Sequence, residues 1–112
     1  MSRKIEEISL LREYLNGINS RSLHHAQAVN EVIFPLIGIV LIKSEGDILV
    51  RDQDGIIKNV IWFTINKTKY SMKYDHDLNA ITLHSGSSTG IKLYEFRNSD
   101  SIKVLIEIFN NL

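Results

Sequence analysis

Apolar residues recur at helical spacing at the start of the chain and predict a helix over residues 3–16. Ser2 is the expected N-cap, because a serine side chain can accept from the free N–H groups of a first turn. Asn16-Gly17 is the expected end, because glycine accepts the left-handed conformation that closes many helices. The predicted apolar stripe consists of Ile5, Ile8, Leu11, Leu15 and Ile18.

A second helix is expected to begin near Arg21, and its end depends on how residues 36–43 are interpreted. Pro35 removes a backbone donor, and several β-branched residues follow it. In one interpretation, which the cap chemistry favours, a long helix bends at Pro35 and ends near Glu45, before a terminating glycine. In the other, the helix ends near Val32 and residues 36–43 form a buried strand.

From Asp47 onward the pattern changes to short segments in which apolar and polar residues alternate. The expected strands are 48–51, 57–65, 69–74, 80–84 and 91–96. Turn-forming residues separate them, among them the segments 52–55 and 66–68. Consecutive short strands joined by short turns predict an antiparallel meander.

The chain ends with a predicted amphipathic helix over residues 99–111, for which Asn98, Ser99 and Asp100 offer caps. Its apolar residues are Ile102, Leu105, Ile106 and Phe109. The predicted fold class is therefore α+β. It has two N-terminal helices, the second long and bent or ending in a strand, then a four- to five-stranded antiparallel meander and a C-terminal helix.

The segment Val60–Ile65 departs from the alternation, because both of its faces are apolar. In a strand with one solvent-exposed face, apolar and polar residues should alternate. This strand is therefore expected to be covered on both sides. The cover would come from helices or from a second subunit. Two amphipathic helices are too few to cover both faces of a sheet. We therefore expect a homo-oligomer, in which a second subunit covers the remaining face.

Composition narrows the class of protein. The 112 residues suit one domain spanning residues 1–112, and the absence of cysteine excludes disulfides and thiolate metal sites. Thirteen basic and thirteen acidic residues cancel, which argues against nucleic-acid or membrane-surface binding. The N-terminal decapeptide lacks the apolar core of a signal peptide, so a cytoplasmic protein is expected.

Two partial motifs fail on their context. The segment Gly86–Gly90 has the G-x-S-x-G spacing of a nucleophile elbow around Ser88, but a strand follows it where that motif needs a helix. Asp75, Asp77 and Asn79 have the spacing of a calcium loop, yet the glycine and the carboxylate that complete such a loop are missing. A hairpin loop and a solvated turn are the expected structures. We predict no catalytic residue, no metal site and no cofactor from these motifs.

The basic residues Lys67, Lys69 and Lys73 interleave with Tyr70 and Tyr74, as in some single-strand nucleic-acid binders. Alternation along a strand puts these two tyrosines on the opposite face from Lys69 and Lys73, which is typical of an ordinary half-buried strand.

No motif fixes the function, and the sequence favours a small non-enzymatic binding or interaction protein that acts as a homo-oligomer. Its partner could be another protein or a small apolar molecule held between helix and sheet. The residues expected to line such a ligand site are Trp62, Tyr70, Met72 and Tyr74.

The competing class is an enzyme with a dispersed acid–base site in a cleft between helix and sheet, for which His24, Glu31 or the Asp75–Asp77 loop would supply the acid and base. His24 and Glu31 stand seven residues apart, two turns along one face of the long predicted helix, and could reach a common ligand. The same two residues are therefore also candidates for ligand binding.

Overall fold

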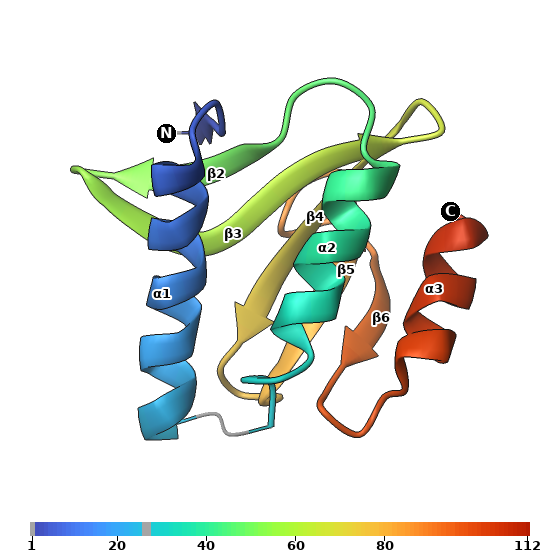
Figure 1. Ribbon diagram of the computed structural model, residues 1–112. Helices are drawn as coiled ribbons and strands as arrows, with labels where there is room; N and C mark the ends of the chain where they lie inside the picture. The colour runs from blue at the N-terminus through green and yellow to red at the C-terminus, as the bar shows by residue number, and fades with distance from the viewer. Residues whose placement is uncertain (1, 26–27) are drawn as a thin grey trace.

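The chain folds as two layers, with helices packed on one face of an antiparallel sheet (Figure 1). The structure, a computed structural model, describes residues 2–25 and 28–112, with the backbone alone over 18–25. Within this part the elements are β1 (Ser2–Lys4), α1 (Ile8–His25), α2 (Ile33–Lys43), β2 (Leu49–Gln53), β3 (Ile56–Ile65), β4 (Thr68–Asp75), β5 (Ala80–Ser85), β6 (Lys92–Phe96) and α3 (Ile102–Asn110). The predicted α+β class and antiparallel meander are confirmed.

The sheet has six strands among the described residues, in the order in which they occur in the chain. The five strands from β2 to β6 lie close to their predicted bounds. The sixth, β1, was not predicted, because Arg3 and Lys4 fall within the predicted helix and Ser2 was its expected N-cap. It pairs antiparallel with β2, with Arg3 opposite Val50, and the pairing continues through a 2.8 Å hydrogen bond from the N–H of Ile5 to the carbonyl of Ile48.

The first helix differs from the prediction at both ends. It begins at Ile8 and continues through Gly17 to His25, so neither the predicted N-cap nor the predicted stop is used. Its buried side chains are Leu10 and Tyr14, whereas Ile8 is exposed. Packing of this face on the sheet outweighs the roughly 1 kcal/mol by which a mid-helix glycine is less favourable than alanine.

The helical interpretation of residues 36–43 is confirmed, and the buried-strand alternative is wrong. The predicted single helix from Arg21 to Glu45 is also wrong, because a turn over 28–32 separates α1 from α2. Pro35 causes no bend, because it lies in the first turn of α2, where backbone N–H groups have no helical acceptor. None of the helices in the described ranges is long and apolar enough to cross a membrane.

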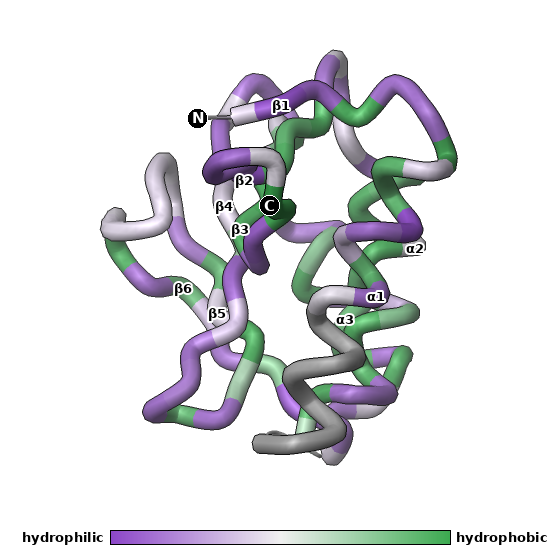
Figure 2. The backbone as a smooth tube through the Cα atoms, turned by 90° about the vertical axis from the view of Figure 1, so that its left-hand side faces the viewer, coloured by the Kyte–Doolittle hydropathy of each residue, from purple (hydrophilic) through white to green (hydrophobic). Residues whose placement is uncertain are grey.

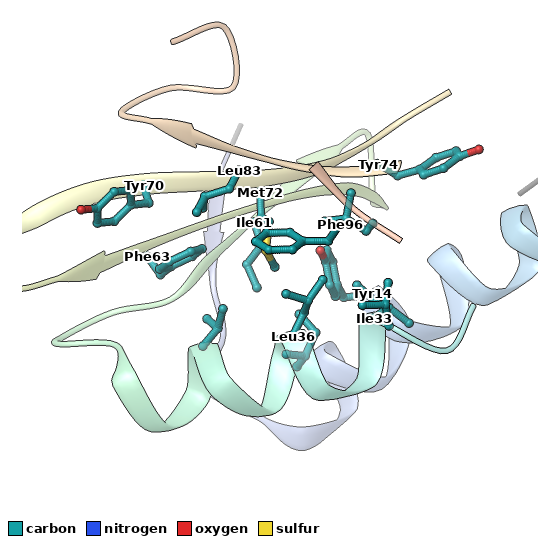
Figure 3. Packing of buried hydrophobic residues seen from close by; sticks show 14 of the residues in the cluster. Tyr14, Ile33, Leu36, Ile61, Phe63, Tyr70, Met72, Tyr74, Leu83 and Phe96 are labelled. Atoms are coloured by element: carbon teal, nitrogen blue, oxygen red, sulfur yellow. The ribbon is translucent and has the colours of Figure 1, made fainter. Parts of the chain in front are cut away.

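Side chains from the helices and from one face of the sheet form the hydrophobic core. Tyr14, Ile33 and Leu36 meet side chains of the four strands from β3 to β6 there (Figure 3). The view in Figure 2 places the helices on one side and the strands on the other. Of the two expected sources of cover for β3, helices account for one face only, because α1, α2 and α3 all lie on the same face. Cover of the other face by a second subunit stays a prediction.

The register between β3 and β4 decides which side chains share a face. The turn between them has two residues, Asn66 and Lys67, both with positive φ (52° and 65°), as a type I′ hairpin turn requires. Ile65 consequently pairs with Thr68. The predicted three-residue turn would have shifted this pairing by one residue, and such a shift moves every side chain to the other face.

Candidate ligand-binding site on the helix-free face of the sheet

We call the side of the sheet that faces away from the helices the helix-free face. Its central row runs across four strands, since Leu49 pairs with Trp62, Trp62 with Ser71, and Ser71 with His84. Trp62 is half-buried, while Ser71 and His84 are buried although no helix covers them. The sheet's own side chains and loops therefore close over this face.

A pocket of about 540 Å³ opens on the helix-free face. It draws on four strands of the sheet, β1 to β4, and on the loop between β5 and β6. The lining residues are Ser2, Leu49, Arg51, Trp62, Lys69, Gly86 and Ser87. This volume lies within the range of small-molecule sites, about 300–1,000 Å³.

An irregularity in the pairing of β2 with β3 lies beside Arg51. The register shifts between Val50 and Asp52, where Arg51 alone on β2 lies opposite the three residues 58–60, so the bulge is in β3. Bulges redirect a side chain relative to the regular ladder, and they often border functional sites. The pairing of β5 with β6 also shifts, between Leu83 and His84. The two irregularities lie on opposite sides of Trp62 in the sheet.

The pocket has a positive electrostatic character. Arg51 and Lys69 line it, and no lining residue is acidic. Both cations are exposed, and neither has an ion-pair partner among the described residues. An anion that enters the pocket would therefore meet two charges that are not already neutralised by a neighbouring carboxylate.

The loop after β5, residues 86–91, forms one wall of the pocket and is held by specific backbone contacts. The N–H of Gly86 donates to the carbonyl of Lys69 at 2.8 Å, and Gly86 has a φ of 77°. At Gly90, a Cβ atom would lie 1.9 Å from the carbonyl oxygen of Ser85. Glycine is therefore needed at both positions, for different reasons.

His84 links this loop to the sheet through hydrogen bonds. Its Nδ1 lies 3.0 Å from the carbonyl oxygen of Gly90, and its Nε2 lies 2.9 Å from the hydroxyl of Thr82. Because a carbonyl oxygen can only accept, Nδ1 donates to Gly90, while Nε2 and the hydroxyl of Thr82 form the second hydrogen bond. Both nitrogens are thus engaged in positioning the loop.

Ser71 is the polar residue on this face whose hydrogen bonding is not satisfied. Its side chain is fully buried, and its hydroxyl has no hydrogen-bond partner in the structure. It lies between Trp62 and His84 in the central row. A buried hydroxyl without a partner is costly, commonly by about 1–3 kcal/mol.

The four residues predicted to line one site lie on two faces. Trp62 is on the helix-free face, whereas Tyr70, Met72 and Tyr74 point into the core beneath the helices (Figure 3). Met72 is fully buried and Tyr70 stacks on Phe63 at a centroid distance of 6.0 Å. These three side chains fill the core, and the structure does not bring them together with Trp62.

Tyr74 lies at the edge of this core. Its hydroxyl donates to Oδ1 of Asn79 at 3.0 Å, and burial, followed by the charge of Asp75, raises the pKa of its phenol above the ordinary value. A shielded tyrosine that holds a turn accounts for both observations.

His24 and Glu31 do not share a helix, so the predicted pair along one helix face is wrong. His24 lies near the end of α1, and its side chain falls outside the described residues. Glu31 lies in the turn before α2, where it is exposed and its N–H donates to Oδ1 of Asn98 at 2.9 Å. The end of α1 at His25 removes the shared helix face on which the pairing of His24 with Glu31 depended.

The remaining motifs have the structures expected from their context. Ser88 lies in the hairpin loop between β5 and β6, and no helix follows it. Asp75 accepts from the N–H of Leu78 at 3.0 Å, as in an ordinary turn. Lys69 and Lys73 lie on the helix-free face, opposite Tyr70 and Tyr74. Across the described ranges, no group of three or more histidine or acidic side chains is placed to hold a metal ion.

Sequence reasoning missed most of the pocket. A two-residue turn at Asn66-Lys67 would have placed Trp62 and Lys69 on one face, so turn length was the available signal. It was weak, because lysine is an unusual residue at a positive φ. No sequence pattern marks the bulge in β3 opposite Arg51.

Comparison with known proteins gives one family. No curated protein matches the chain. The family described as "Integron cassette protein VCH_CASS1 chain" matches residues 11–106. This match begins inside α1, includes every strand from β2 to β6 and ends inside α3. The chain therefore belongs to this integron cassette protein family.

Proposed function

We propose that this protein is a non-enzymatic binding protein whose helix-free face takes a small ligand with a flat apolar body and an anionic group. The observation that carries the proposal is the position of Trp62, which is half-buried in a pocket that it lines together with Arg51 and Lys69, two cations without an ion-pair partner among the described residues. The proposal moves the predicted ligand site from the helix side of the sheet to the opposite side. It keeps only Trp62 from the predicted residues.

The apolar part of the ligand is argued from Trp62 and Leu49, which are cross-strand neighbours. An indole offers a large flat surface on which an aromatic or planar group can stack, and its area contributes strongly to binding. Leu49 is half-buried beside it and widens the apolar floor. A flat ring system fits this floor better than a branched chain, because the floor belongs to a sheet.

The anionic group is argued from Arg51 and Lys69. Arginine presents a planar fork that suits a carboxylate, a sulfonate or a phosphate, and lysine adds a mobile point charge. Hydroxyls of Ser2 and Ser87 lie at the same pocket and can donate further hydrogen bonds. A cationic ligand would meet repulsion instead.

The engagement of His84 favours binding over acid–base catalysis. A general base needs a free nitrogen within reach of the proton that it removes. Both nitrogens of His84 already contact Gly90 and Thr82. The histidine on this face therefore supports the pocket wall, which is a role in a preformed binding site.

The test compares three ligands that share one ring system and differ in charge. Isothermal titration calorimetry with 2-naphthoate, 2-naphthylmethanol and 2-naphthylmethylamine separates the contribution of the ring from that of the charge. We expect the anion to bind most tightly and the ammonium compound least. Trp62→Ala should abolish binding of the anion. Arg51→Gln and Lys69→Gln should each weaken it about tenfold, the usual effect of losing one charge-assisted contact.

Lys73→Gln is the matched control, because Lys73 lies on the same strand and face as Lys69 but outside the pocket. It should bind 2-naphthoate like the unmodified protein. Equal affinities for the anion and the ammonium compound would contradict the proposal. So would an equal loss in Lys73→Gln and Lys69→Gln, since the pocket would then contribute nothing beyond general surface charge.

A further inference from the structure

The outward face of α2 is apolar, which is unusual for a helix at a protein surface. Ile42 is 84% exposed, Phe34 is 51% exposed and Leu41 is 46% exposed, while Lys43 is the only charged residue of this helix. Figure 2 shows α2 in the hydrophobic colour over most of its length. A helix that is apolar all round is normally buried on all sides, and among the described residues nothing covers this face.

The apolar surface continues from α2 onto α3. Ile102 and Ile106 of α3 are exposed, and a groove of about 320 Å³ runs between the helices. The residues lining this groove are Ile39, Ile42, Lys43, Ile106 and Asn110. Single exposed apolar residues are ordinary, but a contiguous apolar surface on two neighbouring helices marks an interaction site.

Gly38 lies at the middle of the outward face. It occupies the interior of α2, where glycine is about 1 kcal/mol less favourable than alanine. Its φ is not in the left-handed region, and a Cβ atom there would meet nothing within 4 Å in the same chain. The chain's own packing therefore gives no reason for a glycine. Close approach of a second backbone would give one.

Phe34, Gly38 and Ile42 form a ridge with a spacing of four residues, with the glycine at its centre. Such ridges pack into the grooves of a second helix. If an identical helix crosses antiparallel at Gly38, Phe34 of one copy lies opposite Ile42 of the other, and the reverse contact follows by symmetry. The ridge is thus complementary to itself.

The charges beside the ridge fit the same arrangement. The two helices run side by side, because Pro35 and Ile102 share one pocket and Ile39 and Ile106 share the next. A two-fold axis at Gly38 therefore passes near residue 105 of α3. This axis places the exposed Lys103 of one copy opposite the exposed Glu107 of the other.

We infer that the occupant of this surface is a second copy of the chain, bound through antiparallel packing of α2 on α2 about a two-fold axis at Gly38. A net charge of zero removes general repulsion between copies. An anionic membrane surface, in contrast, would favour an excess of basic residues, and Glu107 offsets Lys103 here. This interface lies across the sheet from the proposed ligand pocket, so the two proposals fail independently.

Sedimentation velocity over about 1–100 μM tests the dimer, because a micromolar dissociation constant is resolved in this range. We expect a concentration-dependent dimer for the unmodified chain and a monomer for Ile42→Glu, both with unchanged circular dichroism. Ile56→Glu is the matched control, because Ile56 is also exposed, at 59%, but lies on the hairpin between β2 and β3. It should remain dimeric. The inference is overturned if the unmodified chain stays monomeric over this whole concentration range. It is also overturned if Ile42→Glu dimerises like the unmodified chain.

A cross-link tests the axis itself, and the chain suits it because it has no cysteine. Phe34→Cys and Ile42→Cys leave Gly38 in place, and the proposed axis puts residue 34 of one copy opposite residue 42 of the other, within the short reach of a disulfide. Mild oxidation of an equimolar mixture of these two variants should give a covalent heterodimer at least tenfold faster than oxidation of either variant alone gives a homodimer. Equal rates, in solutions where the unmodified chain is dimeric, would exclude packing about Gly38.

Discussion

Oδ1 of Asn98 lies 2.8 Å from the backbone nitrogen of Val32 and accepts its hydrogen bond, from 66 residues away along the chain. It also accepts from the N–H of Glu31 at 2.9 Å. The residue at the N-cap position of α2, Val32, makes no capping hydrogen bond with its own side chain. Asn98 therefore caps α2 from the loop before α3 and joins the two helices at their starts.

Asn98→Ala should lower the free energy of unfolding by about 2 kcal/mol, because it removes the acceptor for two N–H groups at a helix start. Urea unfolding measures the loss. Asn98→Asp is the control, since a carboxylate keeps the acceptor and its charge is favourable at a helix N-terminus. It loses the 2.8 Å hydrogen bond from Nδ2 to Asn30. A larger loss in the aspartate variant than in the alanine variant would contradict the capping role.

Gly17→Ala should stabilise the protein by as much as about 1 kcal/mol, since α1 continues through this residue. The new methyl group would lie 3.9 Å from the carbonyl oxygen of Ile57, which is an ordinary contact. Thermal unfolding shows the sign of the change. A destabilised variant would indicate instead that the helix ends at Asn16, as the sequence pattern predicted.

The strands were predictable because their signals are local. Alternation and turn residues gave five strands within two residues of their bounds at each end, and Pro35 left α2 helical because it falls in the first turn. The strand β1 was hidden, because Ser2–Lys4 has no strand pattern of its own and pairs with residues almost 50 positions away. Only the whole sheet makes those residues a strand.

The site was harder to predict than the fold, because it depends on register. A difference of one residue in the turn at Asn66-Lys67 decides whether Trp62 lies beside Met72 or beside Ser71. Val60–Ile65 was correctly identified as apolar on both faces, but its second face meets Lys73 and Ser71 across the strand pair rather than a helix. The expectation that a partner covers this face stays a prediction, and α2 carries further exposed apolar residues.

Glu95 should contribute stability that depends on pH. Lys92, whose Nζ lies 2.6 Å from one carboxylate oxygen, and Arg97, 2.9 Å from the other, lower the pKa of this glutamate below 4.5. A carboxyl group whose pKa is lower in the folded state stabilises the protein above the unfolded pKa, and this contribution is lost as the pH falls through the folded value.

Glu95→Gln removes the titration and keeps the shape of the side chain. The variant should be less stable than the unmodified protein at pH 7. This difference in stability should narrow in acid, as the pH falls through the lowered pKa and Glu95 becomes protonated as well. Because these ion pairs are exposed, added salt should also narrow the difference in stability. Urea unfolding at pH 7 and in acid measures the change. A difference that is the same at both would show that the charge of Glu95 is not what stabilises the fold.

Gly90→Ala should disrupt both the fold around β5 and the ligand pocket. The added Cβ would lie 1.9 Å from the carbonyl oxygen of Ser85, which belongs to the backbone and cannot move aside like a side chain. The loop must therefore shift, at a cost of about 1–3 kcal/mol. The shift would break the contact between His84 and the carbonyl of Gly90. It would also displace Gly86 and Ser87 from the pocket wall.

Two measurements on this variant separate a structural effect from a functional one. Unfolding experiments give the loss of stability, and titration with 2-naphthoate, on protein shown by circular dichroism to be folded, gives the loss of affinity. Ser88→Ala is the matched control, because it changes a side chain in the same loop without adding an atom to the backbone path. It should leave both quantities unchanged. If Gly90→Ala is destabilised yet binds 2-naphthoate like the unmodified protein, the loop positioned by His84 is not part of the binding site, and the pocket is limited to Trp62, Arg51 and Lys69.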